Sequence, residues 1–281
     1  MNRTFIGGAL ALALAAPILM AQPKPKSKGE IEALQAMFKA PTDDARIAAA
    51  ENVLTKYADT EFKAVALFFE TASYEHKGDW ENTIVYGERT IEADPKHFQA
   101  LIILAKAIVQ HTKEFDLDRD EKLAKVDKYA NSAIDVIQAN PPKPNAALTD
   151  EQWAAAKKDY TSQAHEILGM VDMVRKKPAD AEKEFKIAID DAAKPDPATE
   201  VRLGMALRDE AKYDEAVATF DKVMATPDVL PQVRQYAQAE RVRTLQKKGA
   251  LKPASSAAPA AAQATPAAPT SPAPPATPPK Q

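Results

Sequence analysis

The sequence predicts an all-α protein made of paired antiparallel helices, and three observations lead to this prediction. Gly occurs only 8 times in 281 residues, Ala is abundant and aromatic residues make up 6% of the chain, a composition that favours closely packed helices over sheets and hairpins. Apolar residues recur at i, i+3 or i+4 and i+7, as in Ala216, Phe220 and Val223, which is the spacing of one helix face. The prolines from Pro41 to Pro231 fall between such segments or in their first turns, where proline is tolerated.

The composition also excludes several classes of site. The chain has no Cys, which rules out disulfides, thiolate zinc sites and cysteine nucleophiles. Its net charge is −3, with acids and bases mixed throughout, so there is no electrostatic footprint for nucleic acid. There is no Gly-rich phosphate loop, GxSxG or HExxH motif. We therefore expect no enzymatic activity, no cofactor and no metal.

Residues 1–21 have the pattern of an export signal, with Arg3 followed by an apolar run from Phe5 to Leu19 and then by Ala21. At ~1.5 Å per residue this run is too short to span a ~30 Å hydrocarbon core comfortably, which favours a cleaved signal over a membrane anchor. No Cys follows it, so the lipid attachment of bacterial lipoproteins is unavailable. We expect an exported protein, periplasmic or secreted, in which residues 22–28 form a linker.

The segment 29–252 contains internal repeats. The block from Ala181 to Ala188 aligns with the block from Ala216 to Val223 at an offset of 35 residues, and the pairs Leu168-Gly169 and Leu203-Gly204 precede these blocks by the same interval. This pattern resembles the tetratricopeptide repeat (TPR), a helix–turn–helix unit of 34 residues. The resemblance implies a right-handed superhelix of antiparallel helix pairs.

The units follow one another along the chain with varying agreement to the family pattern. They cover approximately residues 30–63, 64–97, 98–141, 162–196 and 197–230, followed by a terminal helix at 231–248 that suits a cap. The last two units agree best. In the unit 64–97, Thr71 and Gly87 stand where the family has Gly and Phe, and the unit from 98 carries an insertion near 113–121. The first unit is degenerate.

The repeat pattern also predicts how the two helices of a unit approach each other. We expect Gly169 and Gly204 to face Ala181 and Ala216 across their hairpins, because two small residues permit close contact. Phe185 and Phe220 would then fill the gap toward the next repeat. A single hairpin buries only part of its apolar face, so stability must come from stacking on neighbours.

The tail 253–281 is rich in Pro and Ala and has no acidic or large apolar side chain. Such a segment cannot bury enough surface to offset its ordering entropy, so we expect a disordered tail. It is either a passive spacer or a tether to a wall or partner protein.

Two groups of residues resemble metal-binding sites in their spacing. Asp116, Asp118, Asp120 and Asp127 have the spacing of a calcium loop, but Glu121 takes the place of the Gly required for its sharp turn. We favour an insertion whose aspartates cap the next helix. His76 and His111 would lie near the ends of successive helices without a third ligand, which favours a surface role.

The TPR resemblance implies a concave groove lined by the first helix of each unit, and this groove would bind a protein. The sequence places these residues on it: Val65, Phe68, Ile102, Lys106, Val109, Glu166, Met170, Met173, Val201, Met205 and Arg208. Most are apolar, which predicts a contact that salt weakens little. Burial of part of the stripe by superhelix curvature or by an extended helix at 149–176 is the alternative.

These features predict a non-catalytic protein–protein interaction scaffold of the bacterial cell envelope, with an unidentified protein partner. The alternative is a cell-wall or carbohydrate-associated accessory factor that contacts its target through the Pro/Ala-rich tail. The sequence leaves the oligomeric state open.

Overall fold

A computed structural model describes residues 23–143 and 147–250 of the chain. Within these residues the structure is entirely helical, with eleven helices and no strand. The helices are α1 (Lys28–Lys39), α2 (Asp43–Lys56), α3 (Lys63–Lys77), α4 (Trp80–Ala93), α5 (Phe98–His111), α6 (Arg119–Gln138), α7 (Asp150–Val174), α8 (Pro178–Asp191), α9 (Pro197–Asp209), α10 (Tyr213–Ala225) and α11 (Pro231–Ala250). The expected export signal and the Pro/Ala-rich tail lie outside the described residues.

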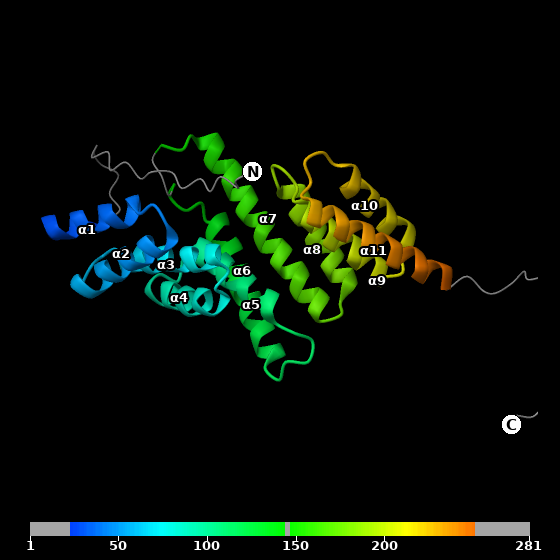
Figure 1. Cartoon of the computed structure of the whole chain (residues 1–281), viewed down its shortest axis with the longest axis horizontal. Coiled ribbons are helices and arrows are strands. Elements are labelled where there is room, and N and C mark those ends of the chain that lie inside the picture. The colour runs from blue at the N-terminus through cyan, green and yellow to red at the C-terminus, as the bar shows by residue number, and fades with distance from the viewer. Residues whose placement is uncertain (1–22, 144–146, 251–281) are drawn as a thin grey trace, which may run out of the picture.

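Consecutive helices pack as antiparallel pairs, and the pairs stack side by side into an elongated molecule (Figure 1). In each pair the odd-numbered helix comes first and the even-numbered helix second. The stack begins with α1 at one end, and α11 packs without a following partner at the other end (Figure 1). The predicted all-α fold of stacked helix pairs is therefore confirmed.

Local sequence accounts for where several helices begin and turn. The side chains of Ser27, Thr42 and Asp79 accept hydrogen bonds from backbone N–H groups in the first turns of α1, α2 and α4, which satisfies donors that have no partner within the helix. Thr149 begins α7 with a reciprocal capping box to Gln152. Gly78 ends α3 with φ of +73°, a backbone conformation that glycine adopts without a Cβ clash.

The last two helix pairs each pack a phenylalanine ring directly against a glycine. A Cβ atom placed on Gly169 would lie 2.6 Å from Cε1 of Phe185, and one on Gly204 would lie 2.6 Å from Cε1 of Phe220. The atoms nearest to these glycines therefore belong to the phenylalanine rings of their own hairpins, and the close approach to Ala181 and Ala216 stays a prediction. The missing Cβ creates the space into which a buried ring fits. Each ring also belongs to a cluster with the next helix pair or cap, Phe185 with Ala206 of α9 and Phe220 with Ala237 of α11.

The pair α3–α4 fills the equivalent space with different residues. Gly87 stands on α4 where the family has Phe, and a Cβ atom there would lie 3.3 Å from Leu104 of α5 and 3.6 Å from Thr71 of α3. The hydroxyl of Thr71 lies 3.1 Å from that of Thr90 across the pair. In this pair the small residue therefore lies on the second helix, and Leu104 of the next pair packs closely against it.

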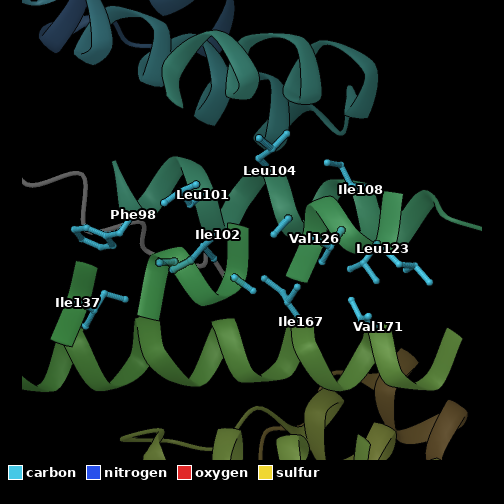
Figure 2. Packing of buried hydrophobic residues seen from close by; sticks show 14 of the residues in the cluster. Phe98, Leu101, Ile102, Leu104, Ile108, Leu123, Val126, Ile137, Ile167 and Val171 are labelled. Atoms are coloured by element: carbon cyan, nitrogen blue, oxygen red, sulfur yellow. The ribbon is translucent and has the colours of Figure 1, made fainter. Parts of the chain in front are cut away.

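The largest apolar cluster of the described residues lies where α5, α6 and α7 meet. Figure 2 shows Ile102, Leu123 and Val126 extending toward Ile167 and Val171 of α7. Helix α7 has 25 residues, so it continues beyond the length of a usual repeat helix. Its first half carries the buried Trp153, whose Nε1 donates to the carbonyl of Pro141 over 3.3 Å. No helix among the described residues has the length and apolar character that crossing a membrane requires.

Candidate functional site

The odd-numbered helices from α3 to α11 lie next to one another along the stack, and we call the surface they form the A-helix face. The residues that the sequence assigned to the groove all belong to these helices. They fall into three groups, according to whether their side chains are buried in the core, paired across neighbouring helices, or partly exposed.

Three of the expected groove residues are core residues. Ile102 is 3% exposed and Val109 is 2% exposed, and both belong to the cluster between α5, α6 and α7. Val201 is 2% exposed in the cluster that joins α9, α10 and α11. The long helix α7 covers the side of α5 that carries Ile102 (Figure 2). These three side chains cannot contact a partner in this structure. The alternative of a stripe partly buried by the extended helix holds for Ile102 and Val109, whereas Val201 is covered by α10 and α11.

The polar members of the predicted groove pair across neighbouring odd-numbered helices. Lys106 on α5 contacts Glu75 on α3 at 3.2 Å, and Glu166 on α7 contacts Arg202 on α9 at 2.5 Å. Arg208 on α9 contacts Glu240 on α11. These pairs connect successive repeats, so the three charged residues predicted for the groove already have partners within the chain.

Val65 and Phe68 lie near the N-terminal end of this face. Val65 packs against the cluster of α1, α2 and α3. The partly exposed ring of Phe68 lies 4.3 Å from the ring of His97, centroid to centroid. Burial disfavours the charged imidazolium and lowers the pKa of His97, so a neutral imidazole is the partner of the Phe68 ring at pH 7.

The three methionines lie on α7 and α9 and keep part of their surface open. Met170 and Met173 pack against the cluster that contains Phe185. Met205 packs beside α11 and accepts a hydrogen bond on its sulfur from the hydroxyl of Tyr236, at 3.6 Å. Thioether side chains adapt readily to different contacts, so the part of the face on α7 and α9 can best accommodate a bound segment.

An open hollow of about 450 Å³ lies between α9 and α11. Its lining residues are Met205, Arg208, Tyr236, Glu240, Arg243, Gln246 and Lys247. Met205 and Tyr236 give it an apolar part, while three cations and one carboxylate give it a basic character. The exposed edge of Tyr236 is available to a ligand.

One buried carboxylate contacts two of the three cations that line the hollow. Glu240 is buried and contacts both Arg208 and Arg243. Burial opposes the charging of Arg208, but Asp209 and Glu240 outweigh this effect and raise its pKa. Lys247 contacts Asp209 at 3.4 Å. The guanidinium groups are thereby fixed in position while Arg243 and Lys247 stay largely exposed.

The sequence prediction included Met205 and Arg208 but missed the residues of α11. The repeat offset contained the necessary information, because adding 35 to positions 201, 205 and 208 gives Tyr236, Glu240 and Arg243. Helix α11 was expected only to cap the stack, although it also continues the A-helix face by one further helix.

No protein-family model matches the chain, and no curated protein sequence matches it. Among solved structures, the crystal structure of a thermophilic TPR protein in Thermus thermophilus matches with a TM-score of 0.52. The match covers 76% of this chain and 99% of that chain, at 16% sequence identity. The chain has the TPR fold.

The aspartates whose spacing resembles a calcium loop are paired with cations. Lys122 contacts Asp116 at 3.2 Å and Asp118 at 2.9 Å, and Arg175 contacts Asp127 at 2.6 Å. Asp118 precedes α6 without capping it through its side chain, so the expected helix cap is wrong: the carboxylate faces Lys122 instead. No group of three or more His, Asp or Glu side chains within residues 23–143 and 147–250 is arranged to hold a metal ion.

The two histidines near the ends of α3 and α5 belong to different contacts. His76 contacts Asp43 of α2. The ring of His111 stacks on Trp80 at 4.5 Å and 14°. The structure therefore does not bring these two imidazoles together as one site.

Proposed function

We propose that this protein is a non-catalytic scaffold of the bacterial cell envelope that binds a segment of a partner protein on its A-helix face. The observation that carries this proposal is the hollow between α9 and α11, which combines partly exposed apolar groups with fixed cations. The TPR fold supports it, because stacked helical repeats form extended surfaces that suit protein segments. The export signal predicted at 1–21 supports the envelope location.

The chemistry of the hollow defines the kind of segment it would take. Met205 and Tyr236 offer an apolar contact, and Arg243 and Lys247 offer two largely exposed cations. A segment with one or two large apolar side chains next to carboxylates would satisfy both. Binding should then depend on salt more strongly than the apolar stripe in the sequence suggested, because screening weakens exposed charge pairs.

A photo-crosslinking residue placed in the hollow tests the proposal directly. Gln246 lines the hollow, whereas Gln238 lies exposed on α11 and is not one of the lining residues. We expect p-benzoylphenylalanine at position 246 to capture a distinct protein from envelope extract, and the same group at 238 not to capture it. Adding Tyr236→Ala should abolish the capture, while Gln235→Ala, an exposed residue outside the lining, should leave it intact.

Two outcomes would contradict the proposal. Equal capture from positions 246 and 238 would show that the hollow has no preference. Capture that survives Tyr236→Ala but disappears when residues 253–281 are removed would favour the alternative, in which the Pro/Ala-rich tail makes the contact with the wall or an accessory partner.

A further inference from the structure

The outer side of α11 carries no charged residue, although charged residues make up 27% of the chain. Val242 lies at its centre, and positions three, four and seven residues away from Val242 lie on the same side of the helix. We call this side the uncharged face, and its exposed residues are Gln235, Gln238, Ala239, Val242, Leu245 and Gln246. Val242 is 45% exposed and Leu245 is 42% exposed, so two large apolar side chains of this face meet solvent.

The charged residues of α11 contact other groups of the chain, and none of them belongs to the uncharged face. Nε of Arg241 contacts Asp221 at 2.6 Å, for example. The complete set is Arg234, Glu240, Arg241, Arg243, Lys247 and Lys248. By contrast, the three glutamine side chains of the face form no hydrogen bond with residues 23–143 or 147–250. Apolar and amide contacts, rather than charge, must therefore select the partner of this face.

The preceding repeat shows what the equivalent surface contacts. Counting back 35 residues from Ala239 and Val242 leads to Gly204 and Leu207 of α9. Gly204 lies against the ring of Phe220 on α10, and Leu207 belongs to the same apolar cluster. The uncharged face therefore corresponds to the surface with which a first helix packs on the second helix of its pair. No second helix follows α11 among the described residues (Figure 1).

We infer that α11 of a second copy takes the place of this second helix, so that two chains associate through their uncharged faces. The second helix of each pair runs antiparallel to the first (Figure 1). Two α11 helices related by a two-fold axis perpendicular to them are also antiparallel, so the second copy has the required direction. The axis passes through Val242, and the contact is isologous, because each copy uses the same surface.

Side chains at equal distances from Val242 are complementary across this axis. Ala239 of one copy lies opposite Leu245 of the second copy, so a small side chain leaves room for a large one. Gln238 lies opposite Gln246, and two amides are able to donate to and accept from each other. Because the face has no charge, its contact with a second copy of itself brings no like charges together, which would oppose association.

The contact is small, so we expect weak association. Six residues a side is well below the roughly 20–30 residues a side of a stable interface. Sedimentation velocity of residues 22–281 should show a sedimentation coefficient that rises with protein concentration between about 10 µM and about 1 mM, in the range of weak dissociation constants. Raising the salt concentration should change this association little, because no charge pair crosses the contact.

Substitutions of Val242 test the position of the axis, because a residue on the axis meets only its own copy. Val242→Glu and Val242→Lys each bring two like charges together, and each should weaken association by about tenfold or more. An equal mixture of the two variants should recover the association, since a carboxylate then faces an ammonium group. Leu230→Glu and Leu230→Lys are the matched controls. Leu230 is 61% exposed and lies outside the face, so these variants should associate like the wild type, alone and mixed.

Disulfide crosslinking tests the direction of the helices, and the chain has no cysteine of its own. A disulfide requires Cα atoms within about 7 Å of each other. Val242→Cys should therefore crosslink with the same residue of a second copy under mild oxidation. Gln235→Cys lies on the same face, but its two copies would be about 21 Å apart along the helices. It should crosslink much more slowly, whereas a parallel arrangement would crosslink both variants alike.

Four results would overturn the inference. The wild type could stay monomeric at every concentration, or the mixture of the two charged Val242 variants could fail to associate. Val242→Cys and Gln235→Cys could crosslink at equal rates. In envelope extract, Val242→Cys could crosslink to a different protein in preference to a second copy, and the face would then have another occupant. A melting curve of each variant checks that these exposed substitutions leave the fold intact.

The inference goes beyond the proposed function and does not depend on it. Tyr236→Ala should abolish capture of a partner in the hollow and leave self-association unchanged. Val242→Glu should abolish self-association and leave the capture unchanged. Position 246 borders both surfaces, so the mass of its crosslinked product distinguishes a second copy from a different protein. Each proposal can therefore fail without the other.

Discussion

Gly169 and Gly204 occupy the same place in successive helix pairs, and each faces the ring of a phenylalanine 16 positions later in the chain. Phe185 and Phe220 are among the largest fully buried side chains of the described residues. A protein interior is close-packed and holds few voids, so the space left by the missing Cβ is fully used. The glycine is required here for its size rather than for its backbone conformation.

Substitution of Gly204 by Ala should therefore destabilise the fold. The new Cβ would lie 2.6 Å from the ring of Phe220, and overpacking of this kind costs about 1–3 kcal/mol. Gly249→Ala is the matched control, because it is also helical and its Cβ would meet nothing within 4 Å. The control should be neutral or stabilising, since Ala favours helices over Gly. Equal melting temperatures for the two variants would refute the Gly–Phe contact.

Glu70 is a second residue with a measurable consequence. It is fully buried on α3, and neither carboxylate oxygen has a hydrogen-bond partner among the described residues. Burial raises the pKa of Glu70 to about 7, while Arg89 acts in the opposite direction and Glu51 adds to the rise. The unfolded chain releases this proton near its ordinary pKa of about 4.5, whereas the folded chain keeps it until about pH 7. The folded state therefore binds this proton more tightly than the unfolded chain does. The stability that the neutral Glu70 carboxyl contributes is complete below pH 4.5 and is lost as pH rises toward 7.

Glu70→Gln should remove this loss. Glutamine stays neutral at every pH, so the variant should resemble the wild type near pH 4.5 and exceed it at pH 8 by up to roughly 3 kcal/mol, the value of a pKa difference of this size. Urea denaturation of both proteins across that range measures the difference. A difference that stays constant with pH would show that the carboxyl does not titrate in the folded state as described.

At the scale of the element, α11 has two roles. Ala237 and Val233 cover the side of the last pair that contains Phe220 and Val223. On another side, Tyr236, Arg243 and Lys247 complete the hollow with α9. The helix is thus both the cap expected from the sequence and a further member of the A-helix face.

Ending the chain at residue 230 should expose the apolar cluster of the last pair. Each large apolar side chain that returns to water costs about 1.5–3 kcal/mol, so the shortened protein should melt earlier, bind a hydrophobic dye and aggregate. A chain ending at residue 250 keeps α11 and is the control. Equal solubility and equal melting of the two proteins would contradict the packing of α11 on Phe220.

The predictability of the site differs from that of the fold for a physical reason. The offset between the Ala181 and Ala216 blocks is local information, and it was sufficient to predict stacked helix pairs. Whether Ile102 faces solvent depends on how closely α7 packs on α5, which a repeat of standard length does not specify. The 25-residue α7 covers Ile102, and the repeat positions alone therefore placed a core residue in the groove.

At the scale of the whole molecule, the apolar residues form several clusters rather than one. The largest joins α5, α6 and α7, while separate clusters lie at the α1–α3 end and along α9, α10 and α11. Stability of a repeat stack is approximately a sum of units and nearest-neighbour interfaces. The centre of the molecule should accordingly be its most stable part, and both ends should open more readily.

Hydrogen exchange of backbone amides can test this distribution with two core truncations. Ile167→Ala removes a buried side chain from the central cluster, and Phe220→Ala removes one from the C-terminal cluster; changes of this kind cost about 2–5 kcal/mol. Phe220→Ala should accelerate exchange in α9, α10 and α11 and leave α5 and α6 as in the wild type. Ile167→Ala should accelerate exchange in α5, α6 and α7 and also in their neighbours, because the central interfaces hold both halves. Leu245→Ala, at a partly exposed position on α11, is the control and should change little. If Phe220→Ala accelerated exchange in α3 as much as in α10, the molecule would unfold as one cooperative unit, and additive stability of neighbouring pairs would be wrong for this chain.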